Sequence, residues 1–231
     1  MPFISPEDAH LTVLNLFTTD APEKQDGLIN EMTKIVNAAA YEGWISSTVH
    51  QGVHSPGTAN LIQWRSGEDL EKRYAGEEFK HRTLPTFGEL TTSIRLLQNE
   101  IVFSQHHPSL GDKVEISPKR DDHTVIEIFQ VAQENLDELV DALGPSQDYL
   151  LEVAGYRSHT VFKGLRARGL EGSFAVCYSQ WESKEAHDAF INEPQSEWSA
   201  ARDKSESRIA SLKTSSDWNS YQVVHTRSAG E

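Results

Sequence analysis

Two asparagines and a tryptophan interrupt otherwise apolar stretches in the first third of the chain. Asn15 stands in an aliphatic run, and Asn60 and Trp64 belong to residues 57–65, which alternate as in a β-strand. Because side chains two apart share a face of a strand, Asn60 and Trp64 point the same way. Two amides and an indole N–H around an apolar cavity could hold an aromatic molecule and stabilise a developing oxyanion. The alternative for Asn15 is a buried amide that bonds to the backbone or to a covering helix.

Three polar side chains follow the tryptophan and are candidates for the same site. Ser66, with an acid three residues later, predicts the start of a short helix that carries Tyr74. His81 comes next, and an imidazole that titrates near neutral pH could take a proton from a phenol or position a substrate. Tyr74 and Arg82 could line the pocket. For each of the three, a solvated position on a helix is an equally good interpretation.

The segments around these residues follow the order of a split βαβ fold. Between the first two strands, a proline-led helix start opens a stretch with apolar residues at helical spacing. Apolar or alternating stretches predict strands at 10–18, 44–51, 58–65 and about 95–105. With the helical region after Ser66, the order is β-α-β-β-α-β, which is the ferredoxin-like plan.

The same plan is repeated in the second half of the chain. Thr12 and Thr48 begin motifs that recur 112 residues later, whereas Trp64 recurs 117 residues later as Trp181. The second hairpin is therefore five residues longer than the first. A repeat of this length indicates a duplicated domain and not a solenoid unit.

The expected fold class is α+β, with two tandem ferredoxin-like (βαββαβ) domains packed sheet to sheet as a pseudo-dimeric α/β barrel. The predicted boundaries are residues 1–107 for the first domain, 108–121 for a linker and 122–231 for the second domain. Each domain then keeps a pocket between its own sheet and its own helices. The candidate site described above belongs to the first domain.

Composition disfavours several classes of function. The chain has 35 acidic and 21 basic residues, a net charge of −14, which disfavours nucleic acid or a membrane as partner and suits a neutral or aromatic small molecule. The lone cysteine excludes an intrachain disulfide, and the sequence has neither a membrane-span pattern nor a signal-peptide pattern. We therefore expect a cytoplasmic protein. Dinucleotide-binding, P-loop and serine-hydrolase motifs are also missing from the sequence.

Together, the duplicated plan, Asn15 and the motif Asn60-Leu-Ile-Gln-Trp64 resemble the antibiotic biosynthesis monooxygenases, which are dimeric α/β-barrel oxygenases of aromatic polyketide pathways. The Asn…Asn-x-x-x-Trp pattern is similar to that of the anthrone oxygenases, where such residues bind substrate and assist its reaction with oxygen. The fused layout and the opening Ser5-Pro-Glu-Asp look most like the angucycline B-ring-opening oxygenases of the jadomycin and gilvocarcin type.

This resemblance implies a monooxygenase of antibiotic biosynthesis that opens a ring of a polycyclic aromatic polyketide by Baeyer–Villiger-like C–C cleavage. O2 is the co-substrate, and reduced flavin (FADH2 or FMNH2) from a separate flavin reductase is the expected cofactor, with no metal and no haem. The chain could also form a homodimer. With the reasoning above, the residues assigned are Asn60, Trp64 and His81 as catalytic and Asn15, Tyr74 and Arg82 as substrate-binding.

The second half departs from this pattern at the two amide positions. By the two offsets, these positions hold Glu127 and Cys177, while the tryptophan is kept as Trp181. The N-terminal pocket is therefore expected to be active and the C-terminal pocket to be structural. A reversed assignment, in which these three residues and His187 form a second site, stays open.

Three other functions also stay open. One is a cofactor-independent, quinone-forming oxygenase of the anthrone type. Another is haem degradation, which is disfavoured because Tyr74 and Ile191, not histidines, lie ten residues after the two tryptophans. The third is a non-enzymatic α/β barrel that binds a ligand, since fold alone does not imply catalysis.

Two further groups of residues carry side chains that could bind a phosphate or a metal ion. Arg166 and Arg168, in the long second hairpin, could meet a flavin phosphate or form only a charged turn. Histidines such as His50 and His54 have no acidic ligand at a spacing diagnostic of a metal site. We therefore expect them to be surface or core residues.

Overall fold

A computed structural model describes residues 2–77, 79–111 and 115–231 of the chain. The predicted strands of the N-terminal half are confirmed, and each of their ends agrees to within two residues. The elements of this half are β1 (Leu11–Thr18), α1 (Pro22–Ala38), β2 (Trp44–Gly52), β3 (Gly57–Trp64), α2 (Gly67–Ala75), a π-helical turn (Phe79–Thr83), α3 (Leu84–Leu90) and β4 (Ser93–His106).

The C-terminal half repeats this order, again with two α-helices before its last strand. Its main elements are β5 (His123–Val131), α4 (Leu136–Leu143), β6 (Tyr156–Arg168), β7 (Ser173–Trp181), α5 (Lys184–Ile191), α6 (Ala200–Leu212) and β8 (Lys213–Ser228). Short 3-10 turns complete the chain at Pro6–Asp8, Pro108–Leu110, Gln133–Asn135, Pro145–Glu152 and Gln195–Glu197.

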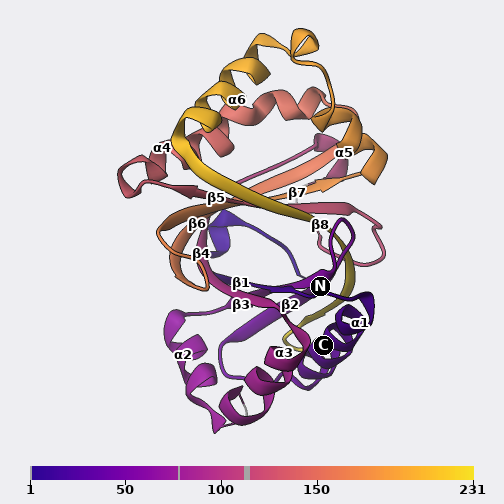
Figure 1. Cartoon of the computed structure of the whole chain (residues 1–231), viewed down its shortest axis with the longest axis vertical. Helices are drawn as coiled ribbons and strands as arrows, with labels where there is room; N and C mark the ends of the chain where they lie inside the picture. Colours follow the sequence, from indigo (N-terminus) through magenta and orange to yellow (C-terminus); the bar gives the residue numbers. More distant parts are fainter. Residues whose placement is uncertain (1, 78, 112–114) are drawn as a thin grey trace.

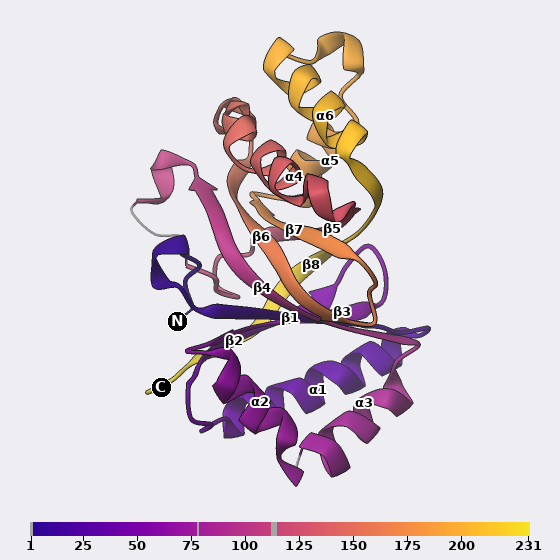
Figure 2. The ribbon, with the colours of Figure 1, turned by 90° about the vertical axis from the view of Figure 1, so that its left-hand side faces the viewer.

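The strands form one closed barrel in the order β1-β3-β2-β8-β5-β7-β6-β4. Each half contributes a four-stranded antiparallel sheet, and the halves join through the pairs β2–β8 and β4–β6. The barrel crosses the middle of the molecule, with α1, α2 and α3 on one side and α4, α5 and α6 on the other (Figures 1 and 2). This architecture confirms the predicted fold class.

The two halves are connected by more than the chain between them. The predicted linker, 108–121, holds the turn Pro108–Leu110, and its Glu115 forms an isolated β-bridge with Phe3. The last strand of each half, β4 or β8, pairs with a strand of the other half as well as with its own. Neither half therefore closes the barrel alone.

Alternation along β1 divides its side chains between two cores. Leu14 and Leu16 belong to the apolar cluster inside the barrel, whereas Val13 and Phe17 pack in clusters under the N-terminal helices. Asn15 stands between the last two and shares their face of the strand. The polar side chain therefore points to the layer between the sheet and the helices.

A buried histidine joins the two halves inside the barrel. His50, from β2, is fully buried; its Nδ1–H donates to the Ala59 carbonyl (3.2 Å), and its Nε2 accepts from the Tyr178 hydroxyl (2.9 Å). Burial lowers the pKa of His50 to about 4, although the bond to Ala59 partly opposes this shift. His50 is thus a neutral core residue, one of the two roles expected from the sequence.

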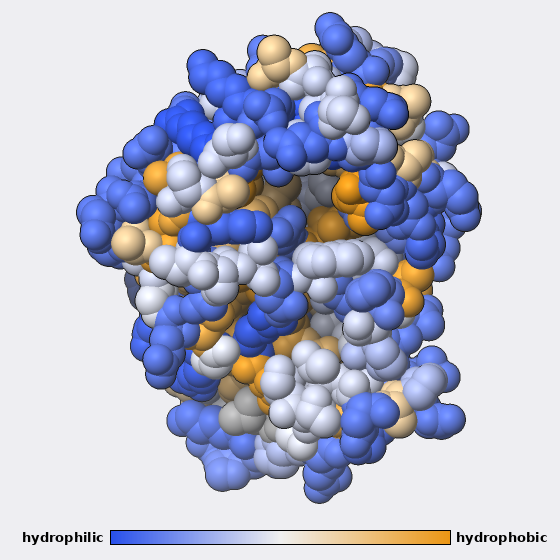
Figure 3. Space-filling model, turned by 45° about the horizontal axis from the view of Figure 1, so that its top comes forward, coloured by the Kyte–Doolittle hydropathy of each residue, from blue (hydrophilic) through white to orange (hydrophobic). Residues whose placement is uncertain are grey.

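The surface agrees with the composition. Most of the face in Figure 3 is hydrophilic, and hydrophobic side chains show mainly in hollows near the middle of that view. No helix in the described part of the chain is both long enough and apolar enough to cross a membrane.

Candidate functional site

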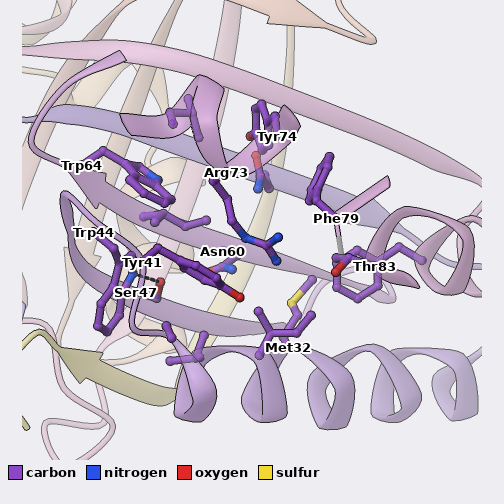
Figure 4. Close-up of a pocket in the computed structure, with 17 residues that line it drawn as sticks. Met32, Tyr41, Trp44, Ser47, Asn60, Trp64, Arg73, Tyr74, Phe79 and Thr83 are labelled. Carbon is purple, nitrogen blue, oxygen red and sulfur yellow. Dashed lines mark hydrogen bonds between the residues drawn. The ribbon is translucent and has the colours of Figure 1, made fainter. Parts of the chain in front are cut away.

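The register of β1 and β3 brings the predicted amides together. Asn15 lies directly opposite Asn60 in this antiparallel pair. Asn60, Ile62 and Trp64 alternate along β3, and all three line the same cavity on the helix side of the sheet. Figure 4 shows Asn60 and Trp64 on the sheet side of this cavity and Met32, from α1, on the opposite side.

This N-terminal cavity lies between the β1–β3 face and the helices α1, α2 and α3. Its empty space, including the opening to solvent, is about 580 Å³. Most of its walls are apolar or aromatic, with prominent contributions from Met32, Tyr41, Trp44, Phe79 and Phe87. Such walls suit a flat, apolar ligand.

Three buried polar atoms of this cavity have no hydrogen-bond partner among the described residues. They are Asn15 Oδ1, Asn60 Oδ1 and Trp64 Nε1. The neighbouring indole of Trp44 is different, because its Nε1 donates to Ser47 Oγ at 3.0 Å. A buried polar atom without a partner costs roughly 1–3 kcal/mol, so a native fold keeps such atoms where a ligand or water completes them. The cavity therefore offers both acceptors and a donor to a bound molecule.

Tyr74, from α2, adds a hydroxyl to the same cavity. Burial raises the pKa of Tyr74 to about 12, although a hydrogen bond with Asn15 and the charge of Arg168 partly oppose this shift. The phenol is therefore protonated near neutral pH and can donate a hydrogen bond. The structure thus brings together four of the predicted residues, the two amides, Trp64 and Tyr74.

Sequence reasoning missed two important members of the wall, Arg73 and Tyr41. The Arg73 guanidinium carbon lies 4.2 Å from the centroid of the Tyr41 ring and 5.5 Å from that of Phe79. The Tyr41 ring in turn stacks on Trp64, with centroids 6.4 Å apart. Figure 4 shows Arg73 reaching into the space between Tyr41 and Phe79. Its position three residues after Leu70, on the helix face that also carries Tyr74, was the signal that could have found it.

Two predicted residues are not brought into this cavity. The His81 side chain is 74% exposed, and its Nε2 lies 3.0 Å from Glu77 Oε2. His81 is not among the described residues that line the cavity. The side chain of Arg82 lies outside the part of the structure that is described, so its predicted role stays a prediction.

The titratable groups of the wall are few. Among the described residues that line the N-terminal cavity, none carries a carboxyl, an imidazole or a thiol. Across the described residues, no group of three or more histidine, cysteine, aspartate or glutamate side chains is placed to hold a metal ion. The wall can therefore stabilise charge through Arg73, Tyr74 and the polar strand residues, but it presents no described proton acceptor of ordinary strength.

A second cavity occupies the equivalent place in the C-terminal half, with about 1,000 Å³ of empty space including its opening. Glu127, Cys177, Trp181 and His187, the residues of the reversed assignment, all line it. Burial raises the pKa of Cys177 to about 12, raises that of Glu127 and lowers that of His187 to about 4, which favours the neutral forms. The Trp181 indole already donates to Ser179 Oγ at 3.1 Å.

This second cavity also contains two buried nitrogen atoms for which the described part of the chain offers no hydrogen-bond partner. They are His159 Nε2 and Arg202 Nε. The other nitrogens of Arg202 bind Glu193 (2.6 Å) and the Phe190 carbonyl (2.8 Å), which anchors the guanidinium. The C-terminal cavity could thus receive a ligand, but its unpartnered atoms differ in kind and position from those of the N-terminal cavity.

Comparison with known proteins places these cavities in a family context. The sequence model of the family described as antibiotic biosynthesis monooxygenase matches residues 123–201. A crystal structure of an anthrone oxidase-like protein is 61% identical, with a TM-score of 0.96, and the alignment covers 100% of this chain and 98% of that one. Among curated proteins, none is significantly similar in sequence to this chain.

More distant structures share the fold alone. A provisionally named monooxygenase from Fusobacterium nucleatum is 8% identical, with a TM-score of 0.64, over 96% of this chain and 95% of its own. Another, from Lactobacillus acidophilus, is 10% identical, with a TM-score of 0.60, over 96% of this chain and 97% of its own. The fused barrel is therefore found in chains of very different sequence.

Proposed function

The chain belongs to the antibiotic biosynthesis monooxygenase superfamily, and we propose that it oxidises an anthrone-type polycyclic aromatic compound to a quinone with O2. The observation that carries this proposal is the unpartnered indole N–H of Trp64, a donor, beside the amide side chains of Asn15 and Asn60 in one aromatic-walled cavity. The name of the structure with 61% identity, an anthrone oxidase-like protein, supports this reaction over the flavin-dependent ring opening expected from the sequence.

The chemistry begins with the acidity of the substrate. Loss of a proton from the methylene group of an anthrone gives an enolate. Its negative charge lies largely on the oxygen of the former carbonyl group. This electron-rich anion passes one electron to O2, which avoids the spin barrier to direct reaction, and the two radicals then form a C–O bond. The protonated peroxide loses water as its O–O bond breaks, together with the remaining proton on that carbon. In balance, one methylene group and one O2 give one carbonyl group and one water.

The polar groups of the cavity stabilise the enolate. In this proposal the Trp64 N–H and the Asn60 NH2 group donate hydrogen bonds to the enolate oxygen, where charge increases during proton loss. The guanidinium of Arg73 supplies a fixed positive charge at the same wall. Tyr74, held as a neutral phenol beside Asn15, orients the ring system through its hydroxyl. Removing one such donor typically lowers kcat about 10²- to 10³-fold.

The proton itself leaves through the mouth of the cavity. Because the described wall residues include no carboxyl, imidazole or thiol, we assign proton acceptance to water at the opening. Lowering the pKa of the substrate then becomes the main catalytic contribution of the protein. The aromatic wall excludes water from the rest of the ring system and strengthens the hydrogen bonds to the oxyanion.

A flavin was the cofactor expected from the resemblance. When bound, a reduced flavin would supply electrons to O2. Its ring would share the aromatic wall, and Arg166 and Arg168, which line a groove next to the cavity, would hold its phosphate. The residues present therefore fit a flavin nucleotide, but the proposed anthrone reaction needs no electrons beyond those of the substrate.

Oxygen uptake with 1,8-dihydroxyanthrone tests the proposal. We expect one O2 consumed per substrate, one ¹⁸O atom from ¹⁸O2 in the quinone carbonyl, and no requirement for reduced flavin. An enzyme-free sample corrects for spontaneous oxidation, and Asn60→Ala, checked for fold by circular dichroism, should lose most of the enzymatic rate. Uptake only with reduced flavin would support the flavin-dependent reaction instead. Tight binding of the quinone without any uptake would favour a ligand-binding barrel.

A further inference from the structure

A groove continues from the N-terminal cavity toward the C-terminal half. The two spaces share Tyr74 and Phe79, and the groove adds about 1,110 Å³ of empty space, including its open side. One of its walls is the N-terminal helical layer, and the other is the end of β6. The β4–β6 register explains this placement, because Arg166 and Arg168 lie opposite Gln98 and Leu96.

The longer second hairpin is what reaches this groove. β2 ends at Gly52, whereas its counterpart β6 extends to Arg168 and pairs along β4. Each half contributes to the result: the N-terminal half provides the cavity, and the C-terminal half provides the far wall of its extension. Part of the longer hairpin, residues 166–168, therefore lies next to the candidate site.

The groove is cationic in an otherwise acidic protein. Among the described residues that line it, Arg166, Arg168 and Lys80 stand against one acid, Glu71, whereas the whole chain has a net charge of −14. Arg166 Nη1 lies 3.2 Å from Glu71 Oε1, but both side chains are largely exposed, and such surface ion pairs contribute little. Arg168 has no ion pair among the described residues. Guanidinium groups with free N–H donors suit a carboxylate or a phosphate, which they bind through two parallel hydrogen bonds.

We propose that this groove is a subsite for an anionic group, carboxylate or phosphate, on a planar aromatic molecule whose rings occupy the N-terminal cavity. Arg166 and Arg168 hold the anion, and the shared wall of Tyr74 and Phe79 lies between the anion and the rings. The inference rests on the proposed function only in placing an aromatic ring system in the cavity. A polycyclic substrate with a carboxylate and a flavin mononucleotide both have this combination of parts.

Equilibrium binding without turnover tests the subsite. Quenching of tryptophan fluorescence would be titrated with anthraquinone-2-carboxylate against its neutral carboxamide, and with FMN against riboflavin. We expect at least one anionic probe to bind tenfold or more tightly than its neutral partner, with a preference that weakens between 50 and 200 mM salt. A preference for the carboxylate over the carboxamide would indicate a substrate with a carboxylate group. A preference for FMN over riboflavin would indicate a nucleotide phosphate.

Variants separate the subsite from general charge effects. Arg166→Gln/Arg168→Gln should remove the preference for the anion and leave the affinity for the neutral partner within about twofold, whereas Arg166→Lys/Arg168→Lys should keep much of the preference. Lys204→Gln, an exposed change on α6, is the matched control and should bind as wild type. Equal affinity for both members of each pair, or a preference that survives the double Gln variant, overturns the proposal. An anion preference without oxygen uptake would support the subsite but contradict the proposed oxygenase.

Discussion

Glu127 lies directly opposite Cys177 in the β5–β7 pair, at the place where Asn15 faces Asn60 in β1–β3. The two offsets read from the sequence thus predict which residues of the two halves are equivalent. The fused barrel keeps the same backbone frame twice but puts an amide pair in one cavity and an acid with a thiol in the other. This difference between the cavities leads to the first prediction.

The two equivalent tryptophans should respond differently to loss of the indole N–H. Trp64→Phe removes a donor that is free to bind substrate, so kcat/KM should fall roughly 10²-fold, as for one oxyanion donor. Trp181→Phe removes a donor already bound to Ser179, so kcat/KM should change by less than about threefold. Initial rates of oxygen uptake for both folded variants make the comparison. The opposite order would move the reaction to the C-terminal cavity.

The Asn60 side chain should support turnover but lower the free energy of unfolding. Asn60→Leu replaces a buried amide whose Oδ1 has no partner, so the free energy of unfolding should rise by roughly 1–2 kcal/mol while turnover is lost. Urea unfolding and oxygen uptake on the same sample measure the two effects. A destabilised Asn60→Leu would show that the amide has a structural role.

Asn99 is the control for this substitution. It is also buried in the N-terminal half, and its Oδ1, like that of Asn60, has no partner among the described residues. Its side-chain NH2, however, donates to the carbonyls of Thr12 (3.3 Å) and Leu97 (3.0 Å). Asn99→Leu removes these two bonds in addition to an unpartnered Oδ1, so its free energy of unfolding should lie roughly 1–3 kcal/mol below that of Asn60→Leu. Urea midpoints of the two variants make this comparison.

Much of the fold could be predicted because strand alternation and the internal repeat are local signals. Residues 57–65 alternate clearly enough to place Asn60 and Trp64 on one face, and the structure confirms this. The closure of the barrel is harder to predict from the sequence. It depends on β4–β6 and β2–β8 pairs between residues far apart in sequence, whose register no short pattern encodes.

The helical layer was harder to predict than the sheet. The proline-led helix start is found at Pro22, but its N-cap, Ala21, has no side chain that could cap the helix by a hydrogen bond. The π-helical turn over Phe79–Thr83 has a wider repeat than an α-helix, so helical spacing from α2 does not give the direction of His81.

Buried histidines should make the fold sensitive to mild acid. Burial lowers the pKa of His50 to about 4, whereas in the unfolded chain this histidine titrates near its ordinary value of 6.5. As the pH falls from 6.5 toward 4, only the unfolded state takes up this proton, so the free energy of unfolding decreases. At pH 5 the loss from His50 should be roughly 2 kcal/mol, and the full stability is present above pH 6.5.

His50→Gln tests this origin of the acid sensitivity, because glutamine can donate to Ala59 and accept from Tyr178 without titrating. Urea unfolding at pH 7.5 and pH 5.0 should show a pH-dependent loss smaller by about 2 kcal/mol than in wild type. His81→Gln, at an exposed histidine, should leave the loss unchanged. An unchanged loss in His50→Gln would mean that His50 is protonated in the folded state or that other groups cause the effect.

The pH dependence of kcat/KM should reflect the ionisation of the substrate and not that of a residue in the cavity. The reactive form is the substrate anion, and burial raises the pKa of Tyr74 to about 12, so Tyr74 stays protonated across the usual assay range. We expect kcat/KM to rise with a single ionisation and then to level off, without a falling limb up to about pH 10. Tyr74→Phe should lower the rate roughly threefold to tenfold, the effect of one hydrogen bond, and keep the shape of the profile. If instead His81→Gln removes an ionisation seen in the wild type near neutral pH, His81 is the proton acceptor and water at the mouth is not.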